Sequence, residues 1–390
     1  MKKSVLVFFI LIGLLIQGFS CGNEDAIIMV SENTDDESQI EEEQEEQGSG
    51  IGEARDITSF DLVAEMGVGW NLGNSFDVIN RDKTFWGNPL PERAMIDQVA
   101  QRGFKTLRIP ITWRFHQEET APFEIEDSYL DRIKEVINYG FENRMHVIIN
   151  VHHDEEWATP NAASAANATA RLSSLWTQVA EEFEMYNDSL IFEVLNEPRE
   201  IGIPQEWTGG TPEGRAIVNQ FTQASVDAIR ATGGNNELRH IMVPTWAAST
   251  TTIAMNDLVV PNNDSKVIIS LHSYFPWPFA GQANQSWGST QDRIALANEL
   301  DRIRNKWIIQ ENRPVILGEW GSVNIHNDSG RQNDINERLA YAEFYASEAS
   351  QRELKTIVWD DGGMFWLFDR HSLTWPFGNI ADAIVNATEN

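Results

Sequence analysis

The chain has 390 residues, and its 59 acidic against 29 basic side chains give a formal net charge of −30 at pH 7. So acidic a protein repels phosphate backbones, which argues against a nucleic-acid partner and favours a neutral ligand. The 14 tryptophans agree with a sugar ligand, because aromatic faces stack on pyranose rings, although packing in the core is their ordinary role.

The N-terminus has the pattern of a secretory signal peptide. Met1-Lys2-Lys3 is basic, and Val5–Ile16 is apolar but too short to span a bilayer. Cys21 is the only cysteine, and it stands where a lipoprotein signal peptidase would cut. The stretch Gly18–Cys21 resembles a bacterial lipobox, although its first residue is glycine instead of the usual leucine. We expect residues 1–20 to be removed and Cys21 to anchor an exported protein at the bacterial cell surface or outer membrane by a lipid; plain secretion is the alternative.

A strongly acidic segment follows. Residues 22–52 contain no Lys or Arg but eleven Asp or Glu. Such a stretch cannot bury enough apolar surface to offset the entropy lost on ordering, and its like charges repel one another. We predict that residues 21–52 form a disordered tether that leads to a single folded domain over residues 53–390. An acidic stretch after a lipidated cysteine also resembles the surface-export signals of some Gram-negative lipoproteins.

The body shows eight apolar runs of strand length, which begin about every forty residues except for a shorter interval between the fifth and the sixth. Stretches with helical spacing lie between most of them, for example Pro91–Ala100 and Tyr129–Tyr139. This alternation predicts an α/β fold in which eight strand–helix units close into a (β/α)8 TIM barrel. The predicted strands are Met66–Trp70, Thr106–Ile109, Val147–Val151, Leu190–Leu195, Ile241–Val243, Val267–Leu271, Val315–Leu317 and Thr356–Trp359.

Two of these strands end in a glutamate. Ile191–Leu195 runs into Glu197 just before a proline that forbids further pairing, and Val315–Leu317 runs into Glu319 beside a glycine. Either glutamate alone would be explained by a salt bridge or a helix cap. Two glutamates delivered in the same way indicate paired acid/base chemistry at the carboxyl ends of the strands, where barrel enzymes have their active sites.

The other strand ends are also polar or aromatic, although each such residue could be purely structural. Adjacent residues on a regular strand point to opposite faces, so His152 and His153 are not expected to chelate one metal ion, and we predict no metal site. No glycine-rich nucleotide fingerprint follows the first strand, and we predict no cofactor. The polar and aromatic strand-end residues are Trp70, Asn71, Arg108, Trp113, His152, His153, Asp154, Glu155, Asn196, Trp246, His272, Tyr274, Trp359 and Asp360.

Seven ordered motifs resemble those of glycoside hydrolase family 5, and they cover nearly the whole body. Connecting segments such as Trp86–Pro89, Glu206–Gly210 and Ile229–Asn236 are similar to those of the subgroup 4 endoglucanases and xyloglucanases of that family. Two positions depart from the subgroup pattern, Val358 in place of a tryptophan and Trp320 in place of a phenylalanine. The motifs are Gly67–Asn74, Leu107–Pro110, Asn150–Asp154, Val194–Pro198, Leu271–Tyr274, Leu317–Glu319 and Val358–Asp360.

The resemblance implies Glu197 as general acid/base and Glu319 as nucleophile of a retaining hydrolysis, with a separation of about 5–5.5 Å. It implies that Asn196 binds the sugar 2-hydroxyl and that Trp359 forms the stacking floor. The remaining implied contacts are Arg108 and Tyr274 to Glu319, His272 to Glu197, His152 and His153 to the sugar beside the cleaved bond, and Asn71 and Trp70 in the neighbouring subsite.

We therefore expect a monomeric endo-β-1,4-glucanase that acts on cellulose-type, mixed-linkage or xyloglucan chains. The alternatives are a surface glycan-binding protein that kept the barrel but lost turnover, and a β-mannanase of the same fold. A binder would not need the complete catalytic set, which favours the enzyme. We also expect an open cleft with aromatic platforms, because seven tryptophans fall at or just beyond strand ends: Trp70, Trp113, Trp157, Trp246, Trp277, Trp320 and Trp359.

Overall fold

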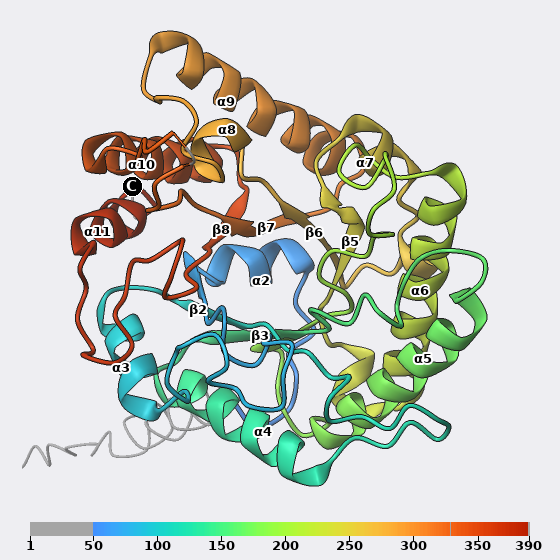
Figure 1. Cartoon of the computed structure of the whole chain (residues 1–390). Helices are drawn as coiled ribbons and strands as arrows, with labels where there is room; N and C mark the ends of the chain where they lie inside the picture. The colour runs from blue at the N-terminus through green and yellow to red at the C-terminus, as the bar shows by residue number, and fades with distance from the viewer. Residues whose placement is uncertain (1–49, 328, 389–390) are drawn as a thin grey trace, which may run out of the picture. The chain divides into compact units, whose positions relative to one another are not determined.

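Eight parallel strands form a closed barrel in the computed structural model, which describes residues 50–327 and 329–388 (Figure 1). Each strand pairs with the next one along the chain, and the last strand pairs with the first. This closure confirms the predicted (β/α)8 fold. The strands are β1 (Gly69–Asn71), β2 (Thr106–Ile109), β3 (His146–Asn150), β4 (Leu190–Glu193), β5 (Ile241–Ser249), β6 (Val267–His272), β7 (Val315–Trp320) and β8 (Lys355–Val358).

Helices surround the barrel, and several begin with side-chain caps. Ser289 and Asp292 form a capping box at one helix, and Asp334 and Glu337 form another. The helices are α2 (Ser59–Glu65), α3 (Arg93–Gln101), α4 (Asp127–Glu142), α5 (Ala165–Glu182), α6 (Pro212–Ala231), η1 (Gly234–Glu237), α7 (Thr252–Asp257), η2 (Pro261–Asn263), α8 (Trp277–Ala280), α9 (Thr290–Arg304), η3 (Asn305–Gln310), α10 (Ile335–Gln351) and α11 (Gly378–Asn386).

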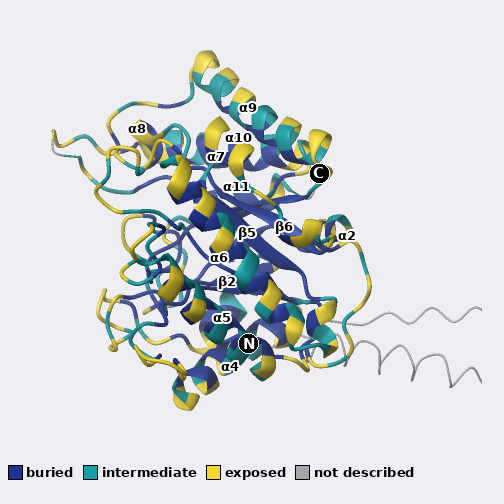
Figure 2. Ribbon diagram, turned by 90° about the vertical axis from the view of Figure 1, so that its right-hand side faces the viewer, coloured by how far each residue is buried: buried dark blue, intermediate teal, exposed yellow. Residues whose placement is uncertain are grey.

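Helix α2 covers the amino-terminal end of the barrel. Its Leu62 and Val63, together with Met66, pack against branched and unbranched aliphatic side chains inside the barrel, such as Ile148 and Ile316. Figure 2 shows α2 on one side of the sheet and the long loops on the other side. Because the amino-terminal end is filled in this way, the carboxyl ends of the strands are left as the face that can accept a ligand.

All eight predicted strands exist, but some of their bounds differ. The first strand starts only after Gly67, because Met66 still belongs to the end of α2 and Gly67 adopts a positive φ of 58°. Strand β7 continues to Trp320, so Glu319 lies inside the strand rather than beyond it. The pairing of β7 with β8 shifts register between Leu317 and Trp320, which redirects the side chains at this end of the barrel.

The signal peptide, Cys21 and most of the predicted tether lie outside the described residues. The described chain is already attached to the body at its first residues. Asn187 donates its backbone N–H to Gly50, and Gly52 donates to Met185, on either side of a bridge between Ile51 and Tyr186. Within the described part of the chain, no helix combines the length and the apolar character needed to cross a bilayer.

Candidate active site

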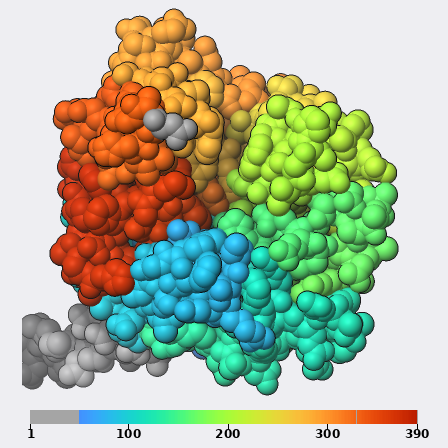
Figure 3. Space-filling view, viewed as in Figure 1, coloured from blue at the N-terminus to red at the C-terminus, as the bar shows by residue number. Residues whose placement is uncertain are grey.

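Two glutamates and a histidine meet on the loop-bearing face of the barrel, which Figure 3 shows to be hollowed near its centre. Glu197 follows β4, Glu319 lies in β7 and His272 ends β6. One carboxylate oxygen of each glutamate and one imidazole nitrogen of His272 all lie within 4.8 Å of one another. This spacing is close to the approximately 5–5.5 Å of retaining glycosidases and well below the approximately 6.5–9.5 Å of inverting ones.

The buried guanidinium of Arg108 organises the floor of the site. Its Nη1 donates to Glu319 Oε1 at 3.0 Å, and its Nη2 donates to Asn196 Oδ1 at 2.8 Å. Its Nε donates to Glu193 Oε2 at 2.7 Å, so the charge of Arg108 serves two buried carboxylates. The sequence analysis missed Glu193. The available signal was a charged residue inside the otherwise apolar run of the fourth strand.

The other neighbours of Glu319 are Tyr274, His272, whose Nδ1 lies 3.6 Å from Glu319 Oε2, and His152. The Tyr274 hydroxyl donates to Glu319 Oε2 at 3.0 Å, and burial raises the pKa of Tyr274 well above its usual value, so this donor stays protonated. His152 Nε2 lies 4.0 Å from Glu319 Oε1. Burial lowers the pKa of His152 well below its usual value, so its ring is neutral. Glu319 is therefore held by fixed hydrogen-bond donors.

Glu197 contacts His272 and an arginine that the sequence analysis assigned no role. His272 Nδ1 lies 2.8 Å from Glu197 Oε1, and Arg199 Nη1 lies 3.5 Å from Glu197 Oε2. Arg199 is itself anchored by Glu155 at 3.1 Å and by Glu206 at 3.3 Å. The signal for Arg199 was its position two residues after Glu197 in the motif.

The two glutamates differ in their pKa values. Burial raises the pKa of Glu319 above its ordinary value, against the positive charges of His272 and Arg108. Burial acts in the same direction on Glu197, but the hydrogen bond to His272 and the charges of His272 and Arg199 bring the pKa of Glu197 below its ordinary value. A general acid at Glu197 needs the higher pKa, and a nucleophile at Glu319 needs the lower one. Taken alone, the two pKa shifts are in the reverse order.

The hydrogen bond between His272 and Glu197 resolves this difference. A proton on His272 Nδ1 and a proton on Glu197 Oε1 are two positions of one proton across the same 2.8 Å contact. His272 can release this proton, whereas Arg108 cannot give up its own. The proton is therefore available at Glu197, while Glu319 keeps the donors that stabilise its ionised form.

Trp359 packs beside His152, the neighbour of Glu319, and is 9% exposed. Its ring lies parallel to that of His152, with centroids 5.8 Å apart and an interplanar angle of 6°. Gly73 closes on the same ring, since a Cβ there would come within 2.8 Å of it. The absence of a side chain at residue 73 is therefore what allows the first loop to reach Trp359.

Two residues predicted to line a neighbouring subsite do not reach the surface. Trp70 is 0% exposed, and its indole N–H donates to Asp360 Oδ2 at 3.1 Å. Asn71 is also buried, where it donates to the Gly318 carbonyl and accepts from Arg108. As neighbours on β1 they point to opposite faces, Asn71 toward Arg108 and Trp70 toward Asp360 and Phe368. Neither side chain is exposed, so the prediction of direct sugar contacts is wrong for these two residues.

The prediction from tryptophan positions also needs correction. Trp113, Trp246 and Trp320 are fully buried, and Trp157 is half-buried under Arg171. Among the seven predicted platforms, only Trp277 is largely exposed, at 51%. A position at a strand end does not reveal which face a bulky ring takes, and most of these rings pack behind the strand ends.

Exposed tryptophans do surround the site, but two of the three lie in loops that the prediction did not use. Trp86 is 36% exposed and packs edge-on against His153. Trp207 is 58% exposed and lies under the Arg199 guanidinium at 4.6 Å. Trp277 packs edge-on against Tyr274. Each exposed ring thus directly contacts a residue of the site.

The argument against chelation by the paired histidines was wrong in its geometry. His152 and His153 follow the last residue of β3, so strand alternation does not apply, and their ring centroids are 4.5 Å apart. Together with Asp77 they place potential ligand atoms within 4.8 Å of one another. Both carboxylate oxygens of Asp77 already accept backbone N–H groups, from residues 74 and 75. The reaction assigned below uses the two carboxyl groups and needs no metal.

Replacing Arg199 by glutamine is expected to move the alkaline limb of the kcat/KM pH profile to higher pH, by about 0.5–1 unit. The positive charge of Arg199 is among the groups that lower the pKa of Glu197, so its loss raises that pKa and keeps the acid protonated longer. Arg199→Lys keeps the charge and serves as the control. An unchanged or lower alkaline limb in Arg199→Gln would show that Arg199 does not tune Glu197.

Comparisons with known proteins agree with this geometry. Residues 71–364 match the family described as Cellulase (glycosyl hydrolase family 5). Endoglucanase B of Clostridium cellulovorans is 44% identical over 343 residues, which cover 85% of this chain and 76% of that protein. The structure of ZgEngA, a subgroup 4 protein in complex with a cellotriose, has a TM-score of 0.83 and 50% identity over 86% of this chain and 100% of its own. A broad-specificity endoglucanase of the same subgroup from Clostridium acetobutylicum has a TM-score of 0.80 and 43% identity over 85% and 100%.

Proposed function

The chain belongs to glycoside hydrolase family 5 and is an endo-β-1,4-glucanase, and from this premise we propose that it cleaves cellulose-type, mixed-linkage and xyloglucan chains. The observation that carries the activity is the placement of Glu197 and Glu319 within 4.8 Å of each other, with Arg108 and Tyr274 bound to the second. The range of substrates rests on the similarity to a broad-specificity endoglucanase.

The carboxyl groups of Glu197 and Glu319 carry out a double displacement. The carboxylate of Glu319 attacks the anomeric carbon while Glu197 protonates the glycosidic oxygen, so the bond to the leaving sugar breaks as the bond to Glu319 forms. Glu197, now ionised, takes a proton from water, whose oxygen attacks the same carbon and releases Glu319. Asn196 accepts from Arg108 through its Oδ1, so its amide nitrogen is the end that can donate to a sugar 2-hydroxyl in the transition state.

We propose that the exposed tryptophans bind the glucan on either side of the cleaved bond. The observation is that Trp86, Trp207 and Trp277 each touch a residue of the site and expose a large part of the ring. The sugar rings of a glucan chain are neutral and have flat apolar faces, so they can stack on exposed indole rings. The platforms therefore come from the loops after β1, β4 and β6 rather than from the strand ends.

Trp277→Ala is expected to raise KM for a soluble β-1,4-glucan by about 3–10-fold with a smaller change in kcat, because a stacking contact is worth about 0.5–1.5 kcal/mol. Initial rates over a range of glucan concentrations measure this. Ile309→Ala removes a similarly exposed apolar side chain from the outer helix layer and serves as the matched control. Equal KM values for the Trp277 variant and the control would contradict the proposed platform.

Two assays test the proposed function directly. Internal cleavage predicts that viscosity of a soluble glucan falls much faster than reducing ends appear, and NMR of the first-formed product should show the β anomer. A parallel panel of glucans and mannans distinguishes the glucanase from a β-mannanase. Absence of turnover on every polysaccharide would instead support a glycan-binding protein.

We propose that the enzyme is held at the bacterial surface by a lipid on Cys21, with the acidic residues 22–49 as a flexible spacer, because residues 50–52 are already bound to the body. The proposal rests on the basic and apolar residues before Cys21 and on the charge of the segment after it. Cys21→Ser is expected to move the protein from the membrane to the soluble fraction with unchanged specific activity. Retention of the variant in the membrane fraction would contradict the lipid anchor.

A further inference from the structure

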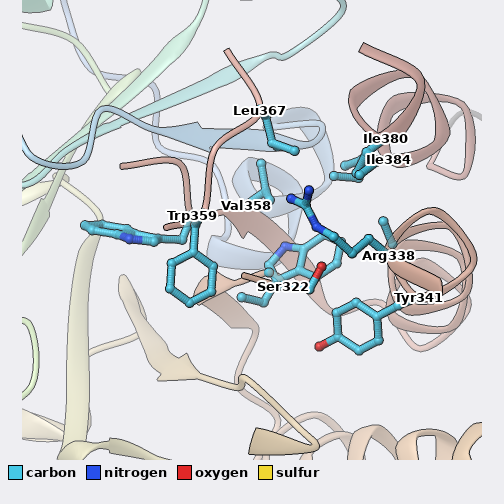
Figure 4. A pocket seen from close by; sticks show the side chains of 12 residues that line it. Ser322, Arg338, Tyr341, Val358, Trp359, Leu367, Ile380 and Ile384 are labelled. Atoms are coloured by element: carbon cyan, nitrogen blue, oxygen red, sulfur yellow. The ribbon is translucent and has the colours of Figure 1, made fainter. Parts of the chain in front are cut away.

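His152 presents one of its two ring nitrogens to the catalytic centre. Its Nε2 lies 4.0 Å from Glu319 Oε1, and its Nδ1 lies 3.2 Å from the side-chain amide of Asn150. Trp359 sets the plane of the ring by stacking on it at 5.8 Å, and the Trp359 indole extends away from the side chains of α10 (Figure 4). The lowered pKa of His152 keeps the ring neutral, so only one of the two nitrogens carries a hydrogen. The position of this hydrogen decides whether Glu319 faces an N–H group or a lone pair.

The orientation of the Asn150 amide is fixed by the groups at its two ends. The backbone N–H of Ile111 lies 3.0 Å from one end, so that end must be the oxygen. Glu193 Oε2 lies 3.0 Å from the other end and also accepts from Arg108 Nε, so that end must be the NH2 group. A flipped amide would place donor against donor at Ile111 and acceptor against acceptor at Glu193. All four residues are 0% exposed, so bulk water does not compete for these bonds.

The tautomer of His152 follows from this orientation. The NH2 group of Asn150 can only donate, so the His152 Nδ1 atom that faces it must be an acceptor. The ring hydrogen is then on Nε2, the nitrogen that lies beside Glu319. One buried amide on β3 thus accepts from the loop after β2, donates to β4 and selects the tautomer of a residue of the active site.

We propose that Asn150 is a positioning residue, which holds His152 in the tautomer with its hydrogen on Nε2 and so turns an N–H dipole toward Glu319. The opposite tautomer would turn a nitrogen lone pair toward a carboxylate oxygen, which is electrostatically unfavourable. The N–H dipole instead stabilises the ionised form of Glu319, the form that attacks the sugar. The inference rests on the proposed role of Glu319 as nucleophile. Asn150 itself is fully buried and acts only through His152.

NMR of the protein with isotope-labelled asparagine and histidine tests the proposal without any need for turnover. Near neutral pH, the ring nitrogens of His152 should show the hydrogen on Nε2, and His152→Gln identifies the signals. A scalar coupling between Asn150 Nδ2 and His152 Nδ1 should report the hydrogen bond between them directly. A hydrogen on Nδ1 in the wild-type protein would overturn the proposal and would leave the glucanase assays unaffected.

Asn150→Asp replaces the donor that faces His152 by an acceptor. We expect Nδ1 of His152 to gain a hydrogen in this variant, because a carboxylate accepts where the amide donated. Ring-nitrogen signals of His152 that stay as in wild type would show that residue 150 does not set the tautomer. The new carboxylate lies beside Glu193, which destabilises the variant, so the wild-type measurement decides the question if Asn150→Asp does not fold.

Kinetics separate positioning from general stability. Asn150→Ala is expected to lower kcat/KM on a soluble β-1,4-glucan by about 3–10-fold, the effect of losing one oriented hydrogen bond. Asn236→Ala is the matched control, since it removes another fully buried amide, one that bonds to Ala180, Thr232 and Arg239 away from the site. The control should lower Tm and leave kcat/KM unchanged. The same result in Asn150→Ala would reduce Asn150 to a structural residue and overturn the proposal.

Discussion

Glu319→Gln is expected to lose at least about 10⁴-fold in kcat on every substrate, because the amide cannot attack the anomeric carbon and no glycosyl-enzyme can form. The substitution is isosteric, but Arg108 and Tyr274 donate to different oxygens of Glu319, so the amide oxygen keeps one of these two hydrogen bonds and the amide NH2 replaces the other acceptor. Tm and the affinity for cellotriose, measured by calorimetry, should stay near the wild-type values and show that the variant is folded.

Glu197→Ala tests the proposed role of the other carboxyl group. It should lose activity on polysaccharides but keep substantial activity on aryl glycosides, whose leaving groups need no proton. Azide should accelerate this variant, because the azide ion needs no base: it attacks the anomeric carbon of the glycosyl-enzyme, the bond to Glu319 breaks and a glycosyl azide is released. If azide instead rescued Glu319→Gln with retained configuration, the roles of the two glutamates would be reversed.

Arg108→Met is expected to have the largest effect on stability among substitutions at the site. It leaves the buried carboxylates of Glu193 and Glu319 without their shared cation, and breaking a buried ion pair by removing one partner costs about 3–5 kcal/mol. Activity should fall as well, because Glu319 loses the charge that opposes its protonation. The acidic limb of the pH profile should therefore move to higher pH.

Two further variants separate charge from geometry. Arg108→Met with Glu193→Gln removes one of the two stranded carboxylates and should recover part of the lost stability. Arg108→Lys keeps the charge but cannot reach Glu193, Glu319 and Asn196 with one planar fork, so it should fold yet turn over slowly. Denaturant unfolding measures the stability of each variant, and kcat measures its turnover. Equal stability of the Arg108→Met and Arg108→Lys variants would show that the charge of Arg108 does not stabilise the two buried carboxylates.

Sequence alone determined the architecture and pointed to the two carboxyl groups that we propose as the reacting pair. Strand runs such as Val267–Leu271 are short and largely apolar, and β6 lies there in the structure, so local pattern and tertiary structure agree. Glu197 and Glu319 could be found because each follows or ends such a run, and strand direction in a parallel barrel sends all such ends to one face.

Only the tertiary structure decided which neighbouring side chains face the ligand. Trp70 and Trp277 look equivalent as tryptophans near strand ends, yet the first is 0% and the second 51% exposed. The direction of a side chain beyond a strand depends on the loop that follows and on what packs over it, and neither is encoded in local periodicity.

The same reason explains the groups that the sequence did not reveal. Glu193 shares the cation of Glu319, and Arg199 stands 3.5 Å from Glu197. The first relation joins residues of three different strands, and the second depends on the conformation of the loop after β4. Their pKa values and hydrogen bonds depend on burial and on distances across the barrel, which exist only once the chain has closed.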